Sequence, residues 1–194
     1  MKGRLLGALA ALALAGCGGA PVAIDFYSLT ANPAPPPAAG ASPLAVHVGP
    51  VTIPEGVDRP QMVMRLADNR VDIDDQHRWA EPLRDAIPRA LADDLARELG
   101  TPRVMSSRQS ATLDFDYRVA VDVQHFESSL TDGAYLDALW TIRARKGGEP
   151  RVGRTSVRVG ATSADAAGVA AAHGQALQKV AADIGAAIRS MEGR

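Results

Sequence analysis

The stretch Leu113-Asp114-Phe115-Asp116-Tyr117-Arg118-Val119-Ala120-Val121-Asp122-Val123-Gln124 decides the fold class of this chain. Apolar side chains occupy every second position from Leu113 to Val123, and mostly charged or polar side chains stand between them. Successive side chains of a strand point to opposite faces, so this alternation predicts a strand with one packed and one solvated face. The chain is therefore expected to contain a sheet that is covered on one side only.

Other segments rich in β-branched and aromatic residues predict further strands at 24–29, 44–53, 62–66, 71–73, 135–145 and 151–159. Gly49-Pro50 predicts a bend inside the second of these, and Asp68-Asn69 suits the turn of a hairpin. The turn-rich segment 146–150 joins the last two strands, so these strands and 113–124 are expected to form an antiparallel meander.

Two helices are predicted. In the first, over 79–99, an apolar residue recurs every fourth position, at Leu83, Ile87, Leu91, Leu95 and Leu99. Pro82 fits its first turn, whereas Pro88 either kinks the helix or marks its true start. The second helix follows Thr162 or Ser163 as its cap and has an apolar stripe at Val169, Ala172, Ala176, Leu177, Val180, Ile184 and Ile188.

These elements predict one α/β (α+β) domain over 24–194, with two long helices packed on one face of a mainly antiparallel sheet. A proline-rich loop is expected at 31–43, since five prolines exclude a helix or a central strand there. The alternative interpretation is a disordered tether that also includes 24–29.

The N-terminus reads as a lipoprotein signal. Lys2 and Arg4 precede twelve residues of Leu, Ala and Gly only, which is shorter than the roughly 20 apolar residues of a membrane span. Leu14-Ala15-Gly16-Cys17 matches the bacterial lipobox, so we expect residues 1–16 to be a signal peptide, Cys17 to carry acyl chains such as palmitate, and 17–23 to be a lipidated tether. An ordinary secretory peptide with an incidental cysteine is the alternative. Gly18, in place of an Asp, favours the outer membrane of a Gram-negative bacterium, with the domain facing the periplasm.

Composition narrows the function classes. Removal of 1–16 leaves 178 of 194 residues, with 19 basic and 22 acidic side chains and a formal net charge of −3. A nucleic-acid partner is not expected, because it needs a basic face. Cys17 is the only cysteine, so lipidation leaves no disulfide and no thiol nucleophile.

No catalytic or metal-binding motif is visible. The four histidines are far apart in sequence, and Asp72-Ile73-Asp74-Asp75 lacks the glycine and glutamate of a calcium loop. A Gly-x-Ser-x-Gly elbow and a phosphate-binding loop are both absent from the sequence. We therefore expect no enzyme, no cofactor and no metal, and the alternative is a periplasmic hydrolase.

Candidate partner-binding residues lie in two distinctive segments, 58–61 and 78–83. They are Arg59, Pro60, Gln61 and Trp79. Arg and Trp are frequent anchors of protein interfaces. The alternative for Trp79 is that it packs against the sheet at the start of the first helix.

Five segments together resemble a known family. They are Leu14-Ala15-Gly16-Cys17, Phe26-Tyr27-Ser28-Leu29, Val48-Gly49-Pro50-Val51, Asp58-Arg59-Pro60-Gln61 and Arg78-Trp79-Ala80-Glu81-Pro82-Leu83. Their sequence, order and spacing are similar to those of the PqiC (YmbA) lipoproteins, the ABC-type transport auxiliary lipoproteins. Beyond residue 100 the likeness rests on the order of elements.

The resemblance implies a non-enzymatic accessory or docking subunit at the outer membrane. Its implied partner is an MCE-domain (PqiB-like) protein that spans the periplasm in a lipid transport system and maintains outer-membrane integrity. Self-association into a ring is also implied. A periplasm-facing lipid-binding carrier, or an assembly lipoprotein of another outer-membrane complex, remains the alternative.

Overall fold

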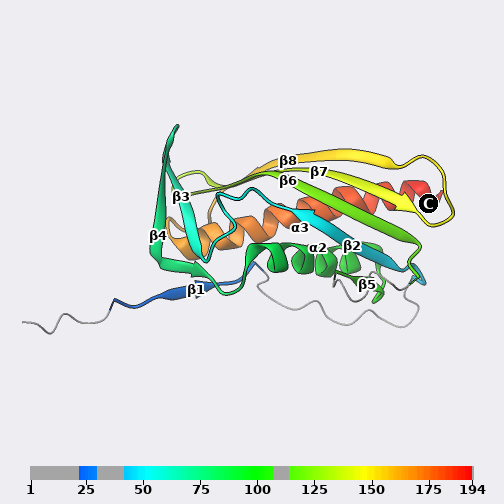
Figure 1. Cartoon of the computed structure of the whole chain (residues 1–194), viewed down its shortest axis with the longest axis horizontal. Helices are drawn as coiled ribbons and strands as arrows, with labels where there is room; N and C mark the ends of the chain where they lie inside the picture. Colours follow the sequence, from blue (N-terminus) through cyan, green and yellow to red (C-terminus); the bar gives the residue numbers. More distant parts are fainter. Residues whose placement is uncertain (1–21, 30–41, 107–113, 194) are drawn as a thin grey trace, which may run out of the picture.

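The computed structural model describes residues 22–29, 42–106 and 114–193. In chain order the elements are β1 (Asp25–Tyr27), β2 (Val46–Thr52), β3 (Gln61–Ala67), β4 (Arg70–Trp79), α2 (Leu83–Leu99), β5 (Val104–Met105), β6 (Tyr117–Ser129), β7 (Gly133–Ala144), β8 (Arg151–Val159) and α3 (Ala166–Met191). The strands form one eight-stranded mixed sheet, and both helices lie on one of its faces (Figure 1). The predicted α+β domain with two long helices on one face is confirmed.

Strand β6 organises the sheet. One of its edges pairs with β7 over its whole length, and β8 continues the antiparallel meander as predicted. Its other edge is shared, because β2 runs parallel to its first half while β3 meets it at Met64 and Ser128. The predicted β3–β4 hairpin is antiparallel, β1 lies parallel to β4 at the sheet edge, and β5 lies parallel to β2. The longest ladders are thus antiparallel, while the parallel pairings join segments distant in sequence.

The alternation that predicted β6 separates two faces. Tyr117, Val119, Val121 and Val123 face the helices and are at most 5% exposed, whereas Arg118, Asp122 and Gln124 lie on the open face. The strand begins at Tyr117, and Leu113 lies outside the described residues. A register shift between Val123 and His125 then turns Phe126 inward, which a strict period of two does not predict.

The first helix begins later than predicted. Trp79 is the last residue of β4, because its N–H donates to the Pro60 carbonyl and its backbone pairs with Tyr27. Helix α2 therefore starts at Leu83, after Pro82 at the cap position, and Pro88 lies inside it rather than at its start. Gly100 ends the helix in the left-handed conformation, with φ of 62°.

The second helix follows the predicted stripe but has a different cap. The carboxylate of Asp165 accepts the Gly168 N–H at 2.7 Å, and the Ser163 hydroxyl donates to that carboxylate instead of capping. Every residue of the predicted stripe of α3 is buried. A polar chain also links helix to sheet, since Trp140 donates to Thr155 and Thr155 donates to Asp183.

The strand predicted over 24–29 is present as β1, and the bend at Gly49-Pro50 appears as a register shift between Val48 and Val51. The proline-rich loop lies outside the described residues apart from 42 and 43, as do the signal peptide and all of the tether except 22 and 23. Within the described part of the chain, no helix is long and apolar enough to cross a membrane.

Candidate functional site at the β1–β4 corner

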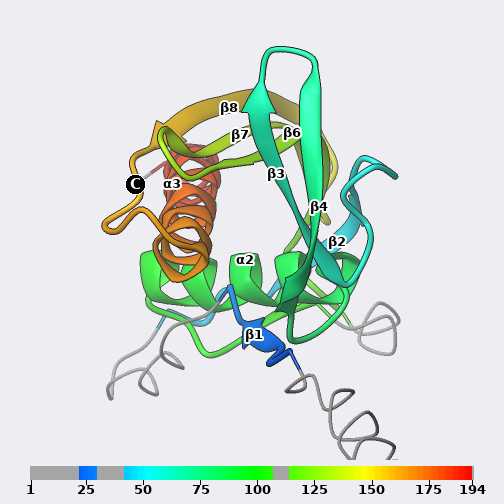
Figure 2. The ribbon, with the colours of Figure 1, turned by 90° about the vertical axis from the view of Figure 1, so that its left-hand side faces the viewer.

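Three segments that are distant in sequence meet at one corner of the fold, which we call the β1–β4 corner: 26–29, 58–61 and 78–83. Backbone hydrogen bonds hold them together. The Trp79 N–H donates to the Pro60 carbonyl at 2.7 Å, and the Ala80 N–H donates to the Tyr27 carbonyl at 2.8 Å. Figure 2 shows β1 at the foot of β4, beside α2.

Side chains reinforce the corner. The Gln61 amide donates to the Asp75 carboxylate at 3.2 Å, and the Arg78 guanidinium donates to the Asp75 carbonyl at 3.1 Å. Arg84, in the first turn of α2, lies 3.4 Å from Asp58. The corner is therefore a built surface in which the loop before β3, the end of β4 and the start of α2 are fixed relative to one another.

The predicted partner-binding residues divide into two layers here. Pro60 is exposed and Arg59 and Gln61 are half-buried, so these three are accessible. The Nε of Arg59 is buried and has no hydrogen-bond partner among the described residues. Trp79 is only 5% exposed and packs beneath them, where the packing alternative placed it. In this structure Trp79 supports the surface from within and does not form part of it.

The interior side of the corner is aromatic. The Trp79 ring meets Phe126 edge-on with centroids 6.0 Å apart, and it meets His173 similarly at 5.9 Å. Phe126 and His173 stack at 3.8 Å. This cluster joins β4, β6 and α3, so the corner is continuous with the main core.

A close approach that the sequence did not reveal fixes the end of the β1 segment. A Cβ at Gly174 of α3 would lie 2.7 Å from the Leu29 carbonyl oxygen, so a larger residue there would displace one of the two backbones. Leu29 itself is 6% exposed and belongs to the core. The 26–29 segment is therefore anchored at its C-terminal end by α3.

Ser128 and His173 form a buried serine–histidine pair that lacks the solvent access of a catalytic site and, among the described residues, its orienting carboxylate. The Ser128 hydroxyl lies 2.9 Å from Nε2 of His173, yet these residues are 3% and 0% exposed. Burial lowers the pKa of His173 to about 3, and its Nδ1 has no partner among the described residues, where a triad would place an orienting carboxylate. The pair is sealed from substrate and acts as a structural hydrogen bond.

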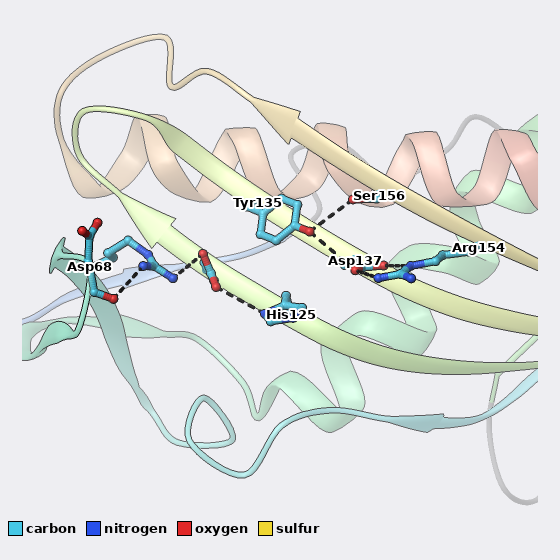
Figure 3. A network of polar contacts seen from close by, with 8 residues as sticks. Asp68, His125, Tyr135, Asp137, Arg154 and Ser156 are labelled. Atoms are coloured by element: carbon cyan, nitrogen blue, oxygen red, sulfur yellow. Dashed lines mark hydrogen bonds and ion pairs between the residues drawn. The ribbon is translucent and has the colours of Figure 1, made fainter.

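The open face of the sheet carries a polar network (Figure 3). Arg154 donates two hydrogen bonds, of 2.8 and 2.5 Å, to Asp137, whose side chain is 1% exposed. These bonds hold the pKa of Asp137 below its usual value. At the other end, Arg65 of β3 lies 2.6 Å from Glu127 of β6, which ties the hairpin to the meander. These charges are satisfied by each other, which is typical of a structural brace.

No metal site is evident where the chain is described, and one cavity lies away from the corner. The residues described contain no group of three or more His, Cys, Asp or Glu side chains able to hold a metal ion. A cavity of about 340 Å³ lies at the far end of the sheet, with Arg103, Asp116, Lys146 and Glu192 among its lining residues. Pro43, Leu44, Tyr117 and Ala144 complete the lining, which is therefore mixed, and its four charged side chains disfavour an acyl chain.

Comparison with known proteins agrees with this fold. A crystal structure of an uncharacterized protein superposes with a TM-score of 0.67 at 18% identity, covering 86% of this chain and 99% of that one. A DUF330 protein from Xanthomonas campestris gives 0.64 at 20% identity, covering 87% and 98%. A PelC dodecamer from Paraburkholderia phytofirmans gives only 0.39 at 12% identity, covering 74% and 92%, and this level of likeness carries no argument about assembly. No match was found among curated proteins.

The fold is thus that of a two-helix, mixed-sheet α+β domain shared by solved DUF330 proteins. The family model described as "ABC-type transport auxiliary lipoprotein component" matches residues 27–185, so the chain belongs to that family. This match confirms the resemblance found in the sequence. The family is one of auxiliary components of transport systems and is not an enzyme family.

Proposed function

We propose that this protein is an outer-membrane lipoprotein, attached through Cys17 and facing the periplasm, that docks an MCE-domain protein of an intermembrane lipid transport system. Its role there is non-enzymatic and supports outer-membrane integrity. The observation that carries the proposal is the β1–β4 corner, where three of the five segments of the family resemblance meet, in a chain that belongs to a transport auxiliary family.

The accessible part of that corner is the proposed partner surface. Arg59, Pro60 and Gln61 are held at the surface by the Pro60–Trp79 and Gln61–Asp75 hydrogen bonds. A preorganised surface loses little conformational entropy on binding, and Arg is a frequent interface anchor. Trp79 contributes by fixing the backbone beneath the surface.

The helix–sheet interface gives no support to the alternative of a lipid carrier. The side chains that α3 turns toward the sheet, among them Leu177, Val180 and Ile184, are at most 2% exposed and belong to one packed core. An acyl chain would need room that these residues fill. Docking is therefore the function that the described residues support best.

The test is affinity purification of the tagged full-length lipoprotein from its own membranes in mild detergent, followed by mass spectrometry. We expect an MCE-domain protein to co-purify with the wild type and to be lost with the double variant R59A/Q61A. The matched control is R151A, an exposed arginine at the start of β8 on the opposite sheet edge. Circular dichroism of each variant verifies folding.

Recovery of an outer-membrane β-barrel or a cell-wall protein instead would discard the proposed partner. The anchor is tested separately with C17S, which should leave the protein folded but mislocalised and inactive. Full restoration of the outer-membrane barrier by this soluble variant would contradict the proposed role of the anchor.

A further inference from the structure

A row of exposed apolar side chains borders the β1–β4 corner. Val22, Ile24 and Phe26 are 66%, 42% and 64% exposed. Phe26 lies in β1, and Ile24 and Val22 stand two and four residues before it in the segment that leads into this strand, so the alternation of a strand would place all three on one side. Clustered exposed apolar side chains are uncommon on soluble domains and mark contact surfaces.

The other side of the same segment explains why this row faces outward. Tyr27 packs against the core and Leu29 is buried, so the alternate positions are directed away from it. β1 is also the terminal strand of the sheet, paired with β4 alone among the described strands. Asp25 falls on the parity opposite to the row, which therefore contains no acidic side chain.

The covalent chain limits how far this row can lie from the lipid anchor. Val22 follows Cys17 by five residues, and five residues span at most roughly 18 Å when fully extended. The polar interfacial region of each leaflet is itself about 5–8 Å thick. If Cys17 is acylated, Val22 therefore lies within roughly 18 Å of this lipid anchor in any conformation of the intervening residues.

We infer that Val22, Ile24 and Phe26 form a membrane-contacting edge that inserts into the lipid interface beside the acylated cysteine. Transfer of aromatic and aliphatic side chains from water to the boundary of headgroups and acyl chains lowers the free energy, and a second apolar contact strengthens a lipid anchor. The contact would orient β1, and with it the β1–β4 corner, toward the membrane, while β8 at the opposite sheet edge faces away. This inference rests on the proposed lipidation of Cys17.

The test places a tryptophan reporter at the row. Full-length protein carrying F26W is purified from membranes and reconstituted into phosphatidylcholine vesicles whose acyl chains are brominated or not. The control is V152W, because Val152 is also apolar and 64% exposed but lies on β8. The two native tryptophans are 5% and 7% exposed and give the same background in both variants.

We expect brominated lipid to reduce the emission of the residue-26 reporter by about twofold or more and to leave the residue-152 reporter nearly unchanged, since an interfacial residue lies about 5–10 Å into the boundary region. Mass spectrometry of the N-terminal peptide reports acylation of Cys17 in the same sample. Acylated protein with no quenching at 26, or with equal quenching at both positions, overturns the membrane edge but leaves the anchor intact. Absence of acylation overturns the anchor and the edge that rests on it.

Discussion

Truncation of Trp79 separates a core role from an interface role at the β1–β4 corner. The W79A variant should destabilise the whole domain, because the ring is 5% exposed and touches Phe126 and His173. If Trp79 were instead an anchor for a partner, its loss would weaken binding and leave the stability of the isolated protein nearly unchanged.

The magnitude follows from the buried area. A tryptophan buries about 150–250 Å², which at roughly 25 cal/mol per Å² corresponds to about 4–6 kcal/mol. Measured large-to-small substitutions of buried aromatic residues cost about 3–5 kcal/mol. We therefore expect the free energy of unfolding to fall by about 4 kcal/mol. For a chain of this size that lowers the melting temperature by roughly 8–16 °C.

The assay is urea unfolding of the mature chain with C17S, followed by far-ultraviolet circular dichroism so that loss of the indole does not alter the signal. The companion variant Q61A changes a half-buried surface residue of the same corner and should shift stability by less than about 1 kcal/mol. A loss below about 1 kcal/mol for W79A, together with loss of partner capture, would refute the core assignment.

Three further predictions concern stability. H173Q should flatten the decline of the unfolding free energy below pH 6 by about 1.4 kcal/mol per pH unit. The reason is that burial lowers the pKa of His173 from 6.5 to about 3, so the folded side chain stays neutral while the unfolded chain takes up a proton. Urea unfolding of wild type and variant between pH 7 and 5 measures this, and parallel slopes of unfolding free energy against pH would contradict it. D137N should be less stable than the wild type at neutral pH, and this deficit should shrink as the pH falls below 3.8. The pKa of Asp137 is lowered by its bonds to Arg154, so this pair stabilises the fold only while the carboxylate is ionised. Thermal melts from pH 7 to 3 measure the deficit, and a constant deficit would argue against the Arg154 pair. G153A should lower the free energy of unfolding by about 1–3 kcal/mol, since a Cβ at this position would lie 2.1 Å from the Trp140 ring. The control G56A should leave stability unchanged, because a Cβ there meets nothing within 4 Å. Equal melting temperatures of the two variants would show that the Trp140 ring shifts freely.

Local periodicity predicted most of the elements. The alternation around Val119 identified β6 and its buried face, the apolar residue at every fourth position identified α2, and the apolar stripe from Val169 to Ile188 identified α3. It failed where a tertiary contact decides the local structure. Trp79 fits the helical repeat equally well, but its backbone pairs with β1 and extends β4 up to that residue.

Pairing between distant segments lies beyond such patterns. The residues of 26–29 and 58–61 do not predict that these two segments meet at the end of β4. The hydrogen bonds that hold them there are made by backbone groups, which all residues have in common. The same holds for Ser128 and His173, which are 45 residues apart. The sequence therefore identified Arg59, Pro60, Gln61 and Trp79 as distinctive, but only the fold separates the surface residues from the one beneath them.

The proposed function requires a contact between the 59–61 surface and an MCE-domain protein at the membrane. Its most direct test is site-specific photo-crosslinking in living cells, with a photoreactive amino acid replacing the exposed Pro60 and, as the control, the exposed Val152. We expect a crosslink to an MCE-domain protein from position 60 and none from position 152. A crosslink from position 152 alone, or from position 60 only to proteins without an MCE domain, would contradict it.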